Sequence, residues 1–369
     1  MKNAVPDIAV VYRLSVEDFF RGGLPYSEGR QIAIWAAAAG ADALHVTAGH
    51  YRSRPSAQVV LPPMNFSEAT FLDYAAEVKK RVSVPVIAVG RLGDPTIAER
   101  AVSQGKADFI ALGRSLIAEP HWVEKVRRGE PIRRCLSCNT CINEMRGGAR
   151  IGCVVNGAAG REALFAAPQI PHGERIAVIG AGPAGLTYAS LVAEGNYVTV
   201  FERQPQAGGA LRAAAKAPLF QEVQTEWRSF ERYFADLVAA CRVKGVQFRF
   251  ATDATAASAL LAGFDTIVIA TGAHYRFGLG PLANWLLDTG MARAPGIARL
   301  FTSVWLRDWL YYKARRGTAL QFRQLARPGQ RVIVIGDAAR AGKSKEAIGS
   351  AFAAALLGAK AGDSLKTNH

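Results

Sequence analysis

The sequence has no long apolar run and is short of acidic residues. None of its apolar stretches reaches the ~18 residues that a membrane-spanning helix needs. The first residues also lack the apolar segment of a signal peptide. These absences argue against a membrane-embedded or secreted protein, and we expect a soluble, cytoplasmic one.

The shortage of acidic residues leaves the chain basic. Asp and Glu number 30 against 45 Lys and Arg, which gives a formal net charge of +15. A basic chain attracts nucleic acids, anionic membranes and acidic proteins alike. The sequence shows no basic stripe interleaved with aromatic residues on a known nucleic-acid-binding module, so we expect no nucleic acid as a partner. Binding of phosphate-bearing cofactors, or of an acidic electron-transfer protein, would favour the same positive charge.

Cysteine is scarce, but four of the five cysteines are crowded into residues 135–153. Such crowding differs from a secreted disulfide framework and indicates a metal site in a reducing compartment. Three close cysteines and one remote cysteine favour a [4Fe–4S] cluster, whereas zinc sites usually have two CxxC pairs. Zinc and unligated thiols are the alternatives for the predicted ligands, which are Cys135, Cys138, Cys141 and Cys153. Cys241, in a helical pattern, is expected to be a small core residue.

Residues 1–130 alternate between short apolar runs and amphipathic stretches, the pattern of parallel strands connected by helices. We expect strands at 8–13, 40–46, 84–90 and 107–113, and helices at 28–39, 66–81 and 96–103. The stretch from Gly40 to Leu44 recurs in form from Gly105 to Ile110, and each opens a strand. Repeated strand–helix units indicate a (β/α)₈ barrel, of which we find only the C-terminal half in this chain.

Glycine–arginine pairs end two of the expected strands, at Gly90–Arg91 and Gly113–Arg114. Active sites of such barrels lie at the carboxyl ends of the strands, and phosphate sites favour the last two strands. Glycine lets backbone N–H groups approach a phosphate, and arginine adds bidentate donors. Arg13 also ends an expected strand, so its side chain should lie at the same end of the barrel, where the active site is expected. For each arginine alone, a surface ion pair is the alternative explanation.

A second α/β pattern begins with a strand at 176–179, followed by Gly180-x-Gly182-x-x-Gly185 and a helix to about residue 194. In this context the glycines predict a tight turn that brings a pyrophosphate onto the helix N-terminus. Glu202 ends the next strand, where a carboxylate can bind the hydroxyl groups of an adenosine ribose that lacks a 2′-phosphate. A glycine turn without a ligand is the alternative.

The other segments complete a predicted division into five parts. Residues 275–330 are rich in Trp, Tyr and Arg and show little strand pattern. Their aromatic and basic stretch at 305–316 predicts packed core with a solvated edge, with contact to a membrane surface or a partner as the alternative. The parts are a partial TIM barrel at 1–130, the cysteine segment at 131–165, a Rossmann-like domain at 170–274, an insertion at 275–330, and the return to the Rossmann-like domain at 331–369.

Four stretches together resemble the iron–sulfur flavoenzymes related to old yellow enzyme, of the trimethylamine or dimethylamine dehydrogenase and 2,4-dienoyl-CoA reductase type. These stretches are Val11–Ser15, Pro85–Arg91, Ala111–Pro120 and the segment from Cys135 to Asn156. The two-residue spacing between Cys138 and Cys141 is similar to the amine dehydrogenase branch. The resemblance implies an FMN-binding barrel, a [4Fe–4S] cluster and a domain that binds FAD or ADP.

The resemblance also implies roles for single residues. Arg13 would lie near the pyrimidine edge of the flavin, and the two glycine–arginine pairs would contact the FMN phosphate. Gly336 and Asp337 would hold the ribityl chain of FAD, and Gly272 would lie where the chain leaves the FAD-binding domain. The expected cofactor-binding residues are Arg13, Gly90, Arg91, Gly113, Arg114, Gly180, Gly182, Gly185, Glu202, Gly209, Gly272, Gly336 and Asp337.

The chain departs from that family's pattern in two ways. It begins where the family's fifth barrel strand would lie, so the half that supplies most substrate-binding and proton-donating residues is missing, and no catalytic residue is assigned. The interval between Gly272 and Arg331, where the family inserts an NAD(P)H-binding domain, is short and has no second GxGxxG motif. We therefore expect electrons to be exchanged with a protein partner.

These observations predict an oxidoreductase that passes electrons between a small-molecule substrate at FMN and an acceptor, through a [4Fe–4S] cluster. The substrate would be a secondary or tertiary amine or an activated alkene. The expected partners are an electron-transfer protein or a chain with the missing half-barrel, within an oligomer. The rival hypothesis is an electron-transfer or assembly subunit, or a remnant, that binds the cluster and FAD or ADP without substrate chemistry.

Overall fold

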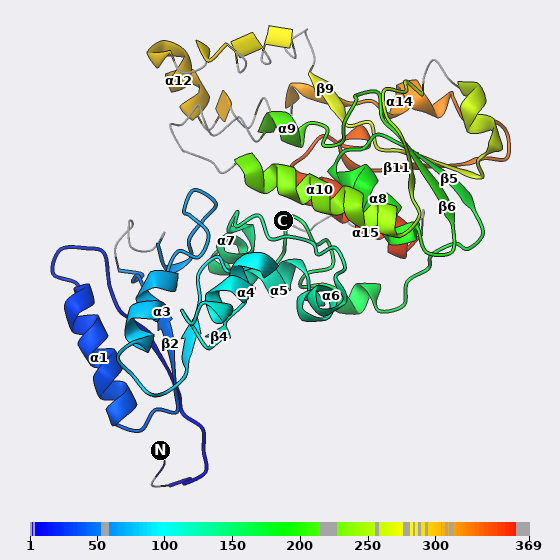
Figure 1. Ribbon diagram of the computed structural model, residues 1–369. Coiled ribbons are helices and arrows are strands. Elements are labelled where there is room, and N and C mark those ends of the chain that lie inside the picture. Colours follow the sequence, from blue (N-terminus) through cyan, green and yellow to red (C-terminus); the bar gives the residue numbers. More distant parts are fainter. Residues whose placement is uncertain are drawn as a thin grey trace. The chain divides into compact units, whose positions relative to one another are not determined.

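The computed structural model divides the chain into two compact units (Figure 1). The first unit is formed by Met1–Leu116 with Ser137–Asn139, and the second by Ile117–Leu136 with Thr140–His369. The residues that the structure describes are 2, 4–52, 59–214, 227–254, 258–275, 281–282, 285–286, 289–291, 294–303, 305–306, 309 and 313–358. Within these residues, no helix combines the length and the apolar character needed to cross a lipid bilayer.

The sheet of the first unit has four parallel strands in the order β1-β2-β3-β4. The strands are β1 (Val11–Ser15), β2 (Ala43–Thr47), β3 (Val86–Ala88) and β4 (Phe109–Ile110). Parallel neighbours need a crossover connection, which is usually a helix. Strands that follow each other in space as they do in sequence are typical of a (β/α)₈ barrel, and the predicted fold class of this part is confirmed.

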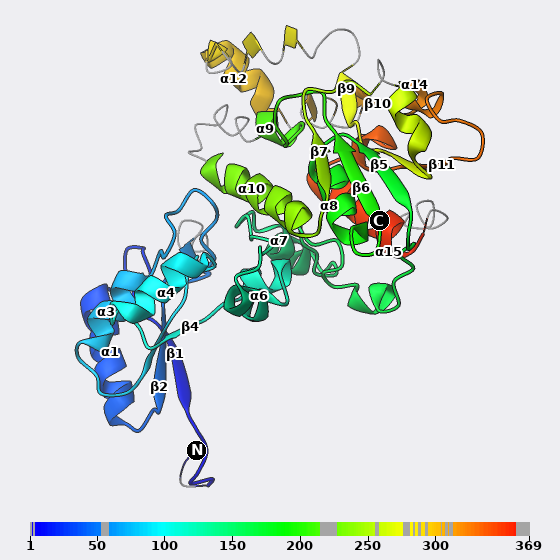
Figure 2. The same cartoon turned by 45° about the vertical axis from the view of Figure 1, so that its right-hand side comes forward.

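Three helices cover one face of this sheet (Figure 2). They are α1 (Tyr26–Ala38), α3 (Leu72–Lys79) and α4 (Pro95–Ser103). Alternate strand residues such as Leu44, Val46 and Val86 are buried against them in one core. The opposite face carries the row Arg13, His45, Ile87 and Phe109, which are paired in register across the four strands.

Two aspartates give the internal repeat a structural meaning. The carboxylate of Asp42 accepts a hydrogen bond from the N–H of Val10 at 2.7 Å, and that of Asp108 accepts one from Val86 at 2.9 Å. Each aspartate therefore ties the start of its own strand to the start of the strand before it. The hydrogen bonds from Lys2 and from Lys79 are the largest of the effects that lower the pKa of Asp42 and Asp108, respectively.

The sheet of the second unit has five parallel strands in the order β11-β8-β5-β6-β7. Its strands are β5 (Arg175–Ile179), β6 (Tyr197–Phe201), β7 (Gln247–Arg249), β8 (Thr266–Ile269) and β11 (Arg331–Val334). Helix α8 (Pro183–Val192) packs between α10 (Trp227–Val243) and α15 (Ser344–Leu356). The central strands β5 and β8 are buried on both faces, so the predicted Rossmann-like fold is confirmed.

An antiparallel ribbon joins the two ends of the predicted insertion. It pairs β9 (Ala273–Tyr275) with β10 (Arg315–Gly317). In the aromatic stretch 305–316, Trp305 is exposed and Ala314 is buried, while residues 307–308 and 310–312 lie outside the described residues. Further helices within the described residues are α5 (Arg114–Ala118), α6 (Trp122–Arg128), α7 (Thr140–Arg146), η1 (Glu162–Phe165), α9 (Leu211–Ala214), η3 (Ser258–Gly263), α12 (Pro295–Thr302), α14 (Ala319–Arg323) and η7 (Gly336–Ala338).

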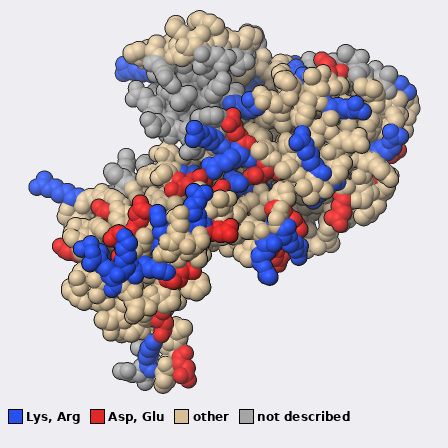
Figure 3. Space-filling model, viewed as in Figure 1, with Lys and Arg blue, Asp and Glu red and all other residues tan. Residues whose placement is uncertain are grey.

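Lys and Arg side chains are interspersed with Asp and Glu on the face shown in Figure 3. Several are paired within one unit. Nε of Arg134 lies 2.8 Å from Oδ2 of Asp236, and Nη2 of Arg331 lies 2.5 Å from Oε2 of Glu174. Part of the positive charge is therefore neutralised within the fold.

Candidate functional site

The two predicted glycine–arginine pairs follow neighbouring strands of the first unit, β3 and β4. Gly90 has a φ of 108°, and a Cβ there would lie 2.6 Å from Cδ2 of Phe71, so only glycine fits. At Gly113 a Cβ would meet no atom within 4 Å, which leaves the backbone open to a ligand. The structure thus brings both pairs to the carboxyl end of the same sheet.

Neighbouring groups hold the two arginines in place. Arg91 donates from Nη1 to the carbonyl of Met64 at 3.3 Å. Arg114 opens helix α5 and donates from Nη1 to Oδ1 of Asn139 at 2.5 Å. Asn139 was not among the predicted site residues, and it is itself fixed by a 2.8 Å hydrogen bond to the carbonyl of Leu61. Two cations and a short helix after the last two strands match the phosphate sites of (β/α)₈ barrels.

Arg13 lies in the middle of β1, so its predicted place at the end of a strand was wrong. The strand ladder begins at Val11 rather than at residue 8, because the N–H of Val10 is bound by the side chain of Asp42. Arg13 pairs in register with His45, which the sequence did not single out. Burial and the charge of Arg13 lower the pKa of His45 to about 4. A neutral imidazole and a guanidinium therefore lie side by side on the sheet face opposite the helices.

The glycine motif of the second unit has the close approaches that its residue types predict. A Cβ at Gly180 would lie 2.5 Å from the carbonyl oxygen of Ala270, and one at Gly185 would lie 2.0 Å from that of Gly180. A Cβ at Gly182 would meet nothing within 4 Å. Two of the glycines are thus required by the packing of the loop, helix and strand, and the third leaves room beside the helix N-terminus.

Glu202 is buried and binds the backbone around the glycine motif. Its Oε2 accepts a hydrogen bond from the N–H of Ala181 at 2.8 Å, and its Oε1 accepts one from Gln204 at 2.9 Å. Each carboxylate oxygen has a second lone pair, so a ribose hydroxyl can still bind. A Cβ at Gly209 would lie 3.1 Å from Cα of Gly182, which brings this predicted residue to the same loop.

Asp337 is paired with an arginine that the sequence did not single out. Oδ2 of Asp337 lies 3.2 Å from Nη1 of Arg315 on β10, and Oδ1 accepts a hydrogen bond from the N–H of Gly342 at 3.2 Å. Burial raises the pKa of Asp337, although the charge of Arg315 opposes the shift. Gly336 packs closely on α8, where an added Cβ would lie 2.9 Å from Cβ of Ala184.

The ribbon also holds the turn at Gly272. The hydroxyl of Thr318 donates to the carbonyl of Gly272 at 2.8 Å and lies 2.6 Å from Oγ1 of Thr271. A residue just past β10 therefore fixes the turn that leads into β9. Gly272 and Asp337 are both held by contacts from the β10 side of the ribbon.

The four clustered cysteines supply the right donors for a metal site and are divided between the two units. Cys138 belongs to the first unit, whereas Cys135, Cys141 and Cys153 belong to the second. Across the described residues, no three Cys, His, Asp or Glu side chains lie together in a way that could hold a metal ion. Both neighbours of Cys138 have a positive φ, 51° at Ser137 and 58° at Asn139. Such backbone conformations are uncommon outside glycine and often occur at functional sites.

Models of two protein families match the chain. Residues 1–132 match the NADH:flavin oxidoreductase / NADH oxidase family. Residues 178–228 match an NAD(P)-binding Rossmann-like domain. The two matches coincide with the sheet that carries the glycine–arginine pairs and with the loop that carries the glycine motif.

Curated relatives resemble most of this chain and are longer than it. An NADH oxidase of Thermoanaerobacter brockii is 36% identical over 282 residues, which are 74% of this chain and 42% of that protein. An N,N-dimethylglycine/sarcosine dehydrogenase of Chromohalobacter salexigens is 32% identical over 309 residues, 81% of this chain and 42% of that protein. The chain thus spans about two fifths of the length of these relatives.

A solved structure of a 2-naphthoyl-CoA reductase in complex with 2-naphthoyl-CoA has the same fold. It aligns with a TM-score of 0.78, over 96% of this chain and 66% of that protein, at 22% sequence identity. This likeness agrees with the parallel sheets of both units.

Proposed function

Given that the chain belongs to the NADH:flavin oxidoreductase / NADH oxidase family, we propose that it forms part of a flavin-dependent oxidoreductase with FMN, an iron–sulfur cluster and an adenine nucleotide. The observation that carries this proposal is the pair of glycine–arginine turns after β3 and β4. The last two strands of a (β/α)₈ barrel are the usual place for a phosphate group.

Arg91 and Arg114 would bind the FMN phosphate, since a guanidinium offers two parallel donors to phosphate oxygens. The open backbone at Gly113 would add N–H donors without a steric clash. Arg13 would donate to the pyrimidine edge of the flavin, and its neighbour His45, being neutral, adds no second charge there. Bound FMN would supply hydride exchange with a substrate, and these residues would bind and orient it.

The glycine motif would hold the adenine nucleotide of FAD or ADP. The space beside Gly182 at the start of α8 is where a pyrophosphate would lie. Glu202 would bind the ribose while its backbone hydrogen bonds hold the loop. The carboxylate of Asp337 already contacts Arg315 and the N–H of Gly342. To bind the ribityl chain of FAD it would have to share these contacts. ADP has no ribityl chain and needs no such contact, so this arrangement favours ADP.

Cys135, Cys138, Cys141 and Cys153 would hold a [4Fe–4S] cluster. Support for this comes from their donor chemistry and spacing, and from the positive φ angles on both sides of Cys138. A bound cluster would supply one-electron transfer.

The substrate would be an amine or an activated alkene, and partners would complete the assembly. One of the relatives is an N,N-dimethylglycine/sarcosine dehydrogenase, whose name gives methylated amines as its substrates. In the described sheet, β1 and β4 are edge strands with unpaired backbone groups on one side. Four further strands, from another chain or another copy, would complete the barrel, and an acidic electron-transfer protein would match the net charge of +15.

A second candidate is a non-catalytic electron-transfer or assembly subunit. It would bind the adenine nucleotide and the cluster, and it would leave the flavin to another chain. The two edge strands favour it, because a four-stranded sheet encloses only part of a flavin site.

Cofactor analysis of the anaerobically purified chain distinguishes these functions. We expect FMN, an adenine nucleotide, and about four iron and four sulfide per chain. The double variant Arg91→Ala/Arg114→Ala should lose at least about nine tenths of its FMN, since two bidentate contacts are removed. Adenine nucleotide and iron should stay unchanged.

Two matched variants control for general damage. Arg100→Ala removes an exposed arginine of α4 and should keep FMN. Cys241→Ser removes the buried cysteine outside the predicted set and should keep iron, whereas Cys141→Ser should lose it. Iron and adenine nucleotide without FMN in the wild type would select the electron-transfer subunit. Equal FMN in the wild type and the double arginine variant would overturn the proposed phosphate site.

A further inference from the structure

A small polar cavity lies within the second unit, away from the predicted cofactor-binding residues. Its volume is about 40 Å³, and it is lined by residues of α8, α10 and the segment 119–133. Roughly 10–15 Å³ is enough for one water molecule, so this cavity has room for two or three waters or for one small anion. Neither the glycine motif nor the cysteines line it.

Two buried hydroxyl groups at this cavity lie close to each other, but neither makes a well-aligned hydrogen bond within the described residues. They belong to Thr187 of α8, which is 4% exposed, and to Tyr233 of α10, which is 1% exposed. Burial raises the pKa of Tyr233, so its phenol keeps its proton and remains a donor. Because buried polar groups are nearly always bound, two hydroxyls without a well-aligned hydrogen bond at one cavity indicate a ligand that accepts hydrogen bonds.

The charged side chains that line the cavity are Glu119, Lys125, Arg133 and Asp236. Asp236 is matched by Arg134, whose Nε lies 2.8 Å from its Oδ2. With Arg134 included, the cations outnumber the carboxylates by one.

Lys125 is matched by Glu119, whose Oε2 lies 2.5 Å from Nζ. Burial raises the pKa of Glu119, but Lys125 and Arg133 outweigh this effect and keep the carboxylate ionised. Arg133 itself donates to the carbonyl of Ala118 at 3.1 Å and lies 5.3 Å from the ring centre of Phe352. Both of these contacts are with uncharged groups.

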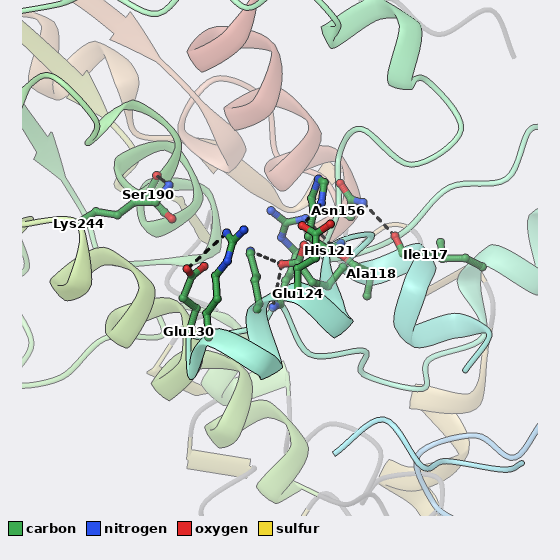
Figure 4. Close-up of polar contacts among 12 residues, drawn as sticks. Ile117, Ala118, His121, Glu124, Glu130, Asn156, Ser190 and Lys244 are labelled. Atoms are coloured by element: carbon green, nitrogen blue, oxygen red, sulfur yellow. Dashed lines mark hydrogen bonds and ion pairs between the residues drawn. The ribbon is translucent and has the colours of Figure 1, made fainter. Parts of the chain in front are cut away.

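A second lysine adds to this excess. Lys244, just after α10, donates to the carbonyl of Ser190 on α8 at 2.8 Å (Figure 4). Burial, and then the charge of Lys125, lower the pKa of Lys244, although Glu194 opposes the shift. The cations around the cavity thus repel one another, and a bound negative charge would relieve this repulsion.

We propose that the cavity binds one small inorganic anion, of the size of chloride, bromide or nitrate, which accepts hydrogen bonds from Tyr233 and Thr187. Water would satisfy the hydroxyls but would not offset the one positive charge by which Lys125, Arg133 and Arg134 exceed Glu119 and Asp236. The site is independent of the flavin and of the adenine nucleotide, and so of the proposed function.

The test uses bromide as the probe on the full chain. Thermal unfolding is followed from 0 to 100 mM sodium bromide, with sodium gluconate holding the ionic strength constant because gluconate is too large for the cavity. We expect the unfolding midpoint of the wild type to rise by about 2–4 °C and to saturate. The double variant Tyr233→Phe/Thr187→Val, which keeps the side-chain shapes, should show no rise.

Tyr26→Phe is the matched control, because Tyr26 also has a buried hydroxyl without a partner but lies in the first unit. It should keep the full bromide response. A crystal soaked in bromide should show one anomalous peak between Tyr233 and Thr187. The same bromide response in the wild type and the double variant, or ordered waters in place of the peak, would overturn the proposal.

Discussion

The two parallel sheets of this molecule differ in what covers them. In the second unit, Val178 and Ile267 lie on central strands and are 0% exposed. In the first unit, Val46 on the helix-facing side is 0% exposed, but Val11 and Phe109 on the other side are 54% and 58% exposed. Parallel sheets normally have both faces covered. The second sheet is therefore covered on both faces, whereas the first has a face with exposed apolar side chains beside Arg13 and His45, which the proposed partner strands would cover.

The largest expected effect separates the buried strands from the open face. Ile267→Ala should lower the free energy of unfolding of the second unit by about 2–5 kcal/mol, because it leaves a cavity in the core. Phe109→Ala should change that of the first unit by less than about 0.5 kcal/mol, because the ring is largely exposed. Denaturant unfolding of the full chain checks both values. Val46→Ala, on the helix-facing side, should lower the free energy of unfolding of the first unit by about 2 kcal/mol. A similar loss for Phe109→Ala would show that the face opposite the helices is packed.

A smaller effect separates packing from binding within the glycine motif. Gly185→Ala should destabilise the second unit by about 1–3 kcal/mol, because the new Cβ would lie 2.0 Å from the carbonyl oxygen of Gly180. Gly182→Ala should leave stability nearly unchanged but weaken adenine nucleotide binding by about tenfold or more, since its Cβ would enter the space for the pyrophosphate. Calorimetry of unfolding and of ADP binding checks the pair. Equal nucleotide affinity in Gly182→Ala and the wild type would contradict the assignment of this space.

The smallest expected effect is an opposite pH response of two aspartates, one in each unit. The folded pKa of Asp108 is lowered, chiefly by Lys79, so its contribution is present at neutral pH and is lost as the pH falls below about 4. That contribution should be about 0.5–1 kcal/mol, since the side chain is partly exposed. The folded pKa of Asp337 is raised, chiefly by burial, so its contribution is largest in acid and falls as the pH rises through that pKa.

Asparagine variants make the pH comparison measurable. Asp108→Asn should reduce the fall in stability of the first unit as the pH decreases below about 4. Asp337→Asn should reduce the fall in stability of the second unit as the pH increases. Unfolding midpoints between pH 3 and 7 check both. Lys79→Met, which removes the main cause of the lowered pKa, should reproduce part of the effect of Asp108→Asn.

The sequence was sufficient for the features that depend on local patterns. Runs such as Val86–Ala88 and Arg175–Ile179 are apolar and bounded by helical stretches, and both form parallel strands. The glycine spacing at 180–185 predicted the turn, because the close contacts that require glycine there are made by neighbouring parts of the same strand–turn–helix unit. The repeat at Asp42 and Asp108 was visible as well, although its hydrogen bonds were not.

Features that depend on pairing between distant residues could not be predicted. Arg315 lies in a segment without a strand pattern, and it meets Asp337 only because β10 pairs with β9. Asn139 reaches Arg114 across 25 positions. Arg13 was misplaced because the apolar residues before Val11 favour a strand, while the carboxylate of Asp42 takes the N–H of Val10 and delays the ladder. Hydrogen bonds of this kind require the tertiary structure.

The two aspartate contacts of the first sheet also bear on how fast this unit folds. Each contact spans a single strand–helix–strand module, with separations of 32 residues between Val10 and Asp42 and 22 residues between Val86 and Asp108. Loops of this length close at a modest entropic cost, and low contact order speeds folding. The unit can therefore assemble module by module as the chain leaves the ribosome, without waiting for strands that are more distant in sequence.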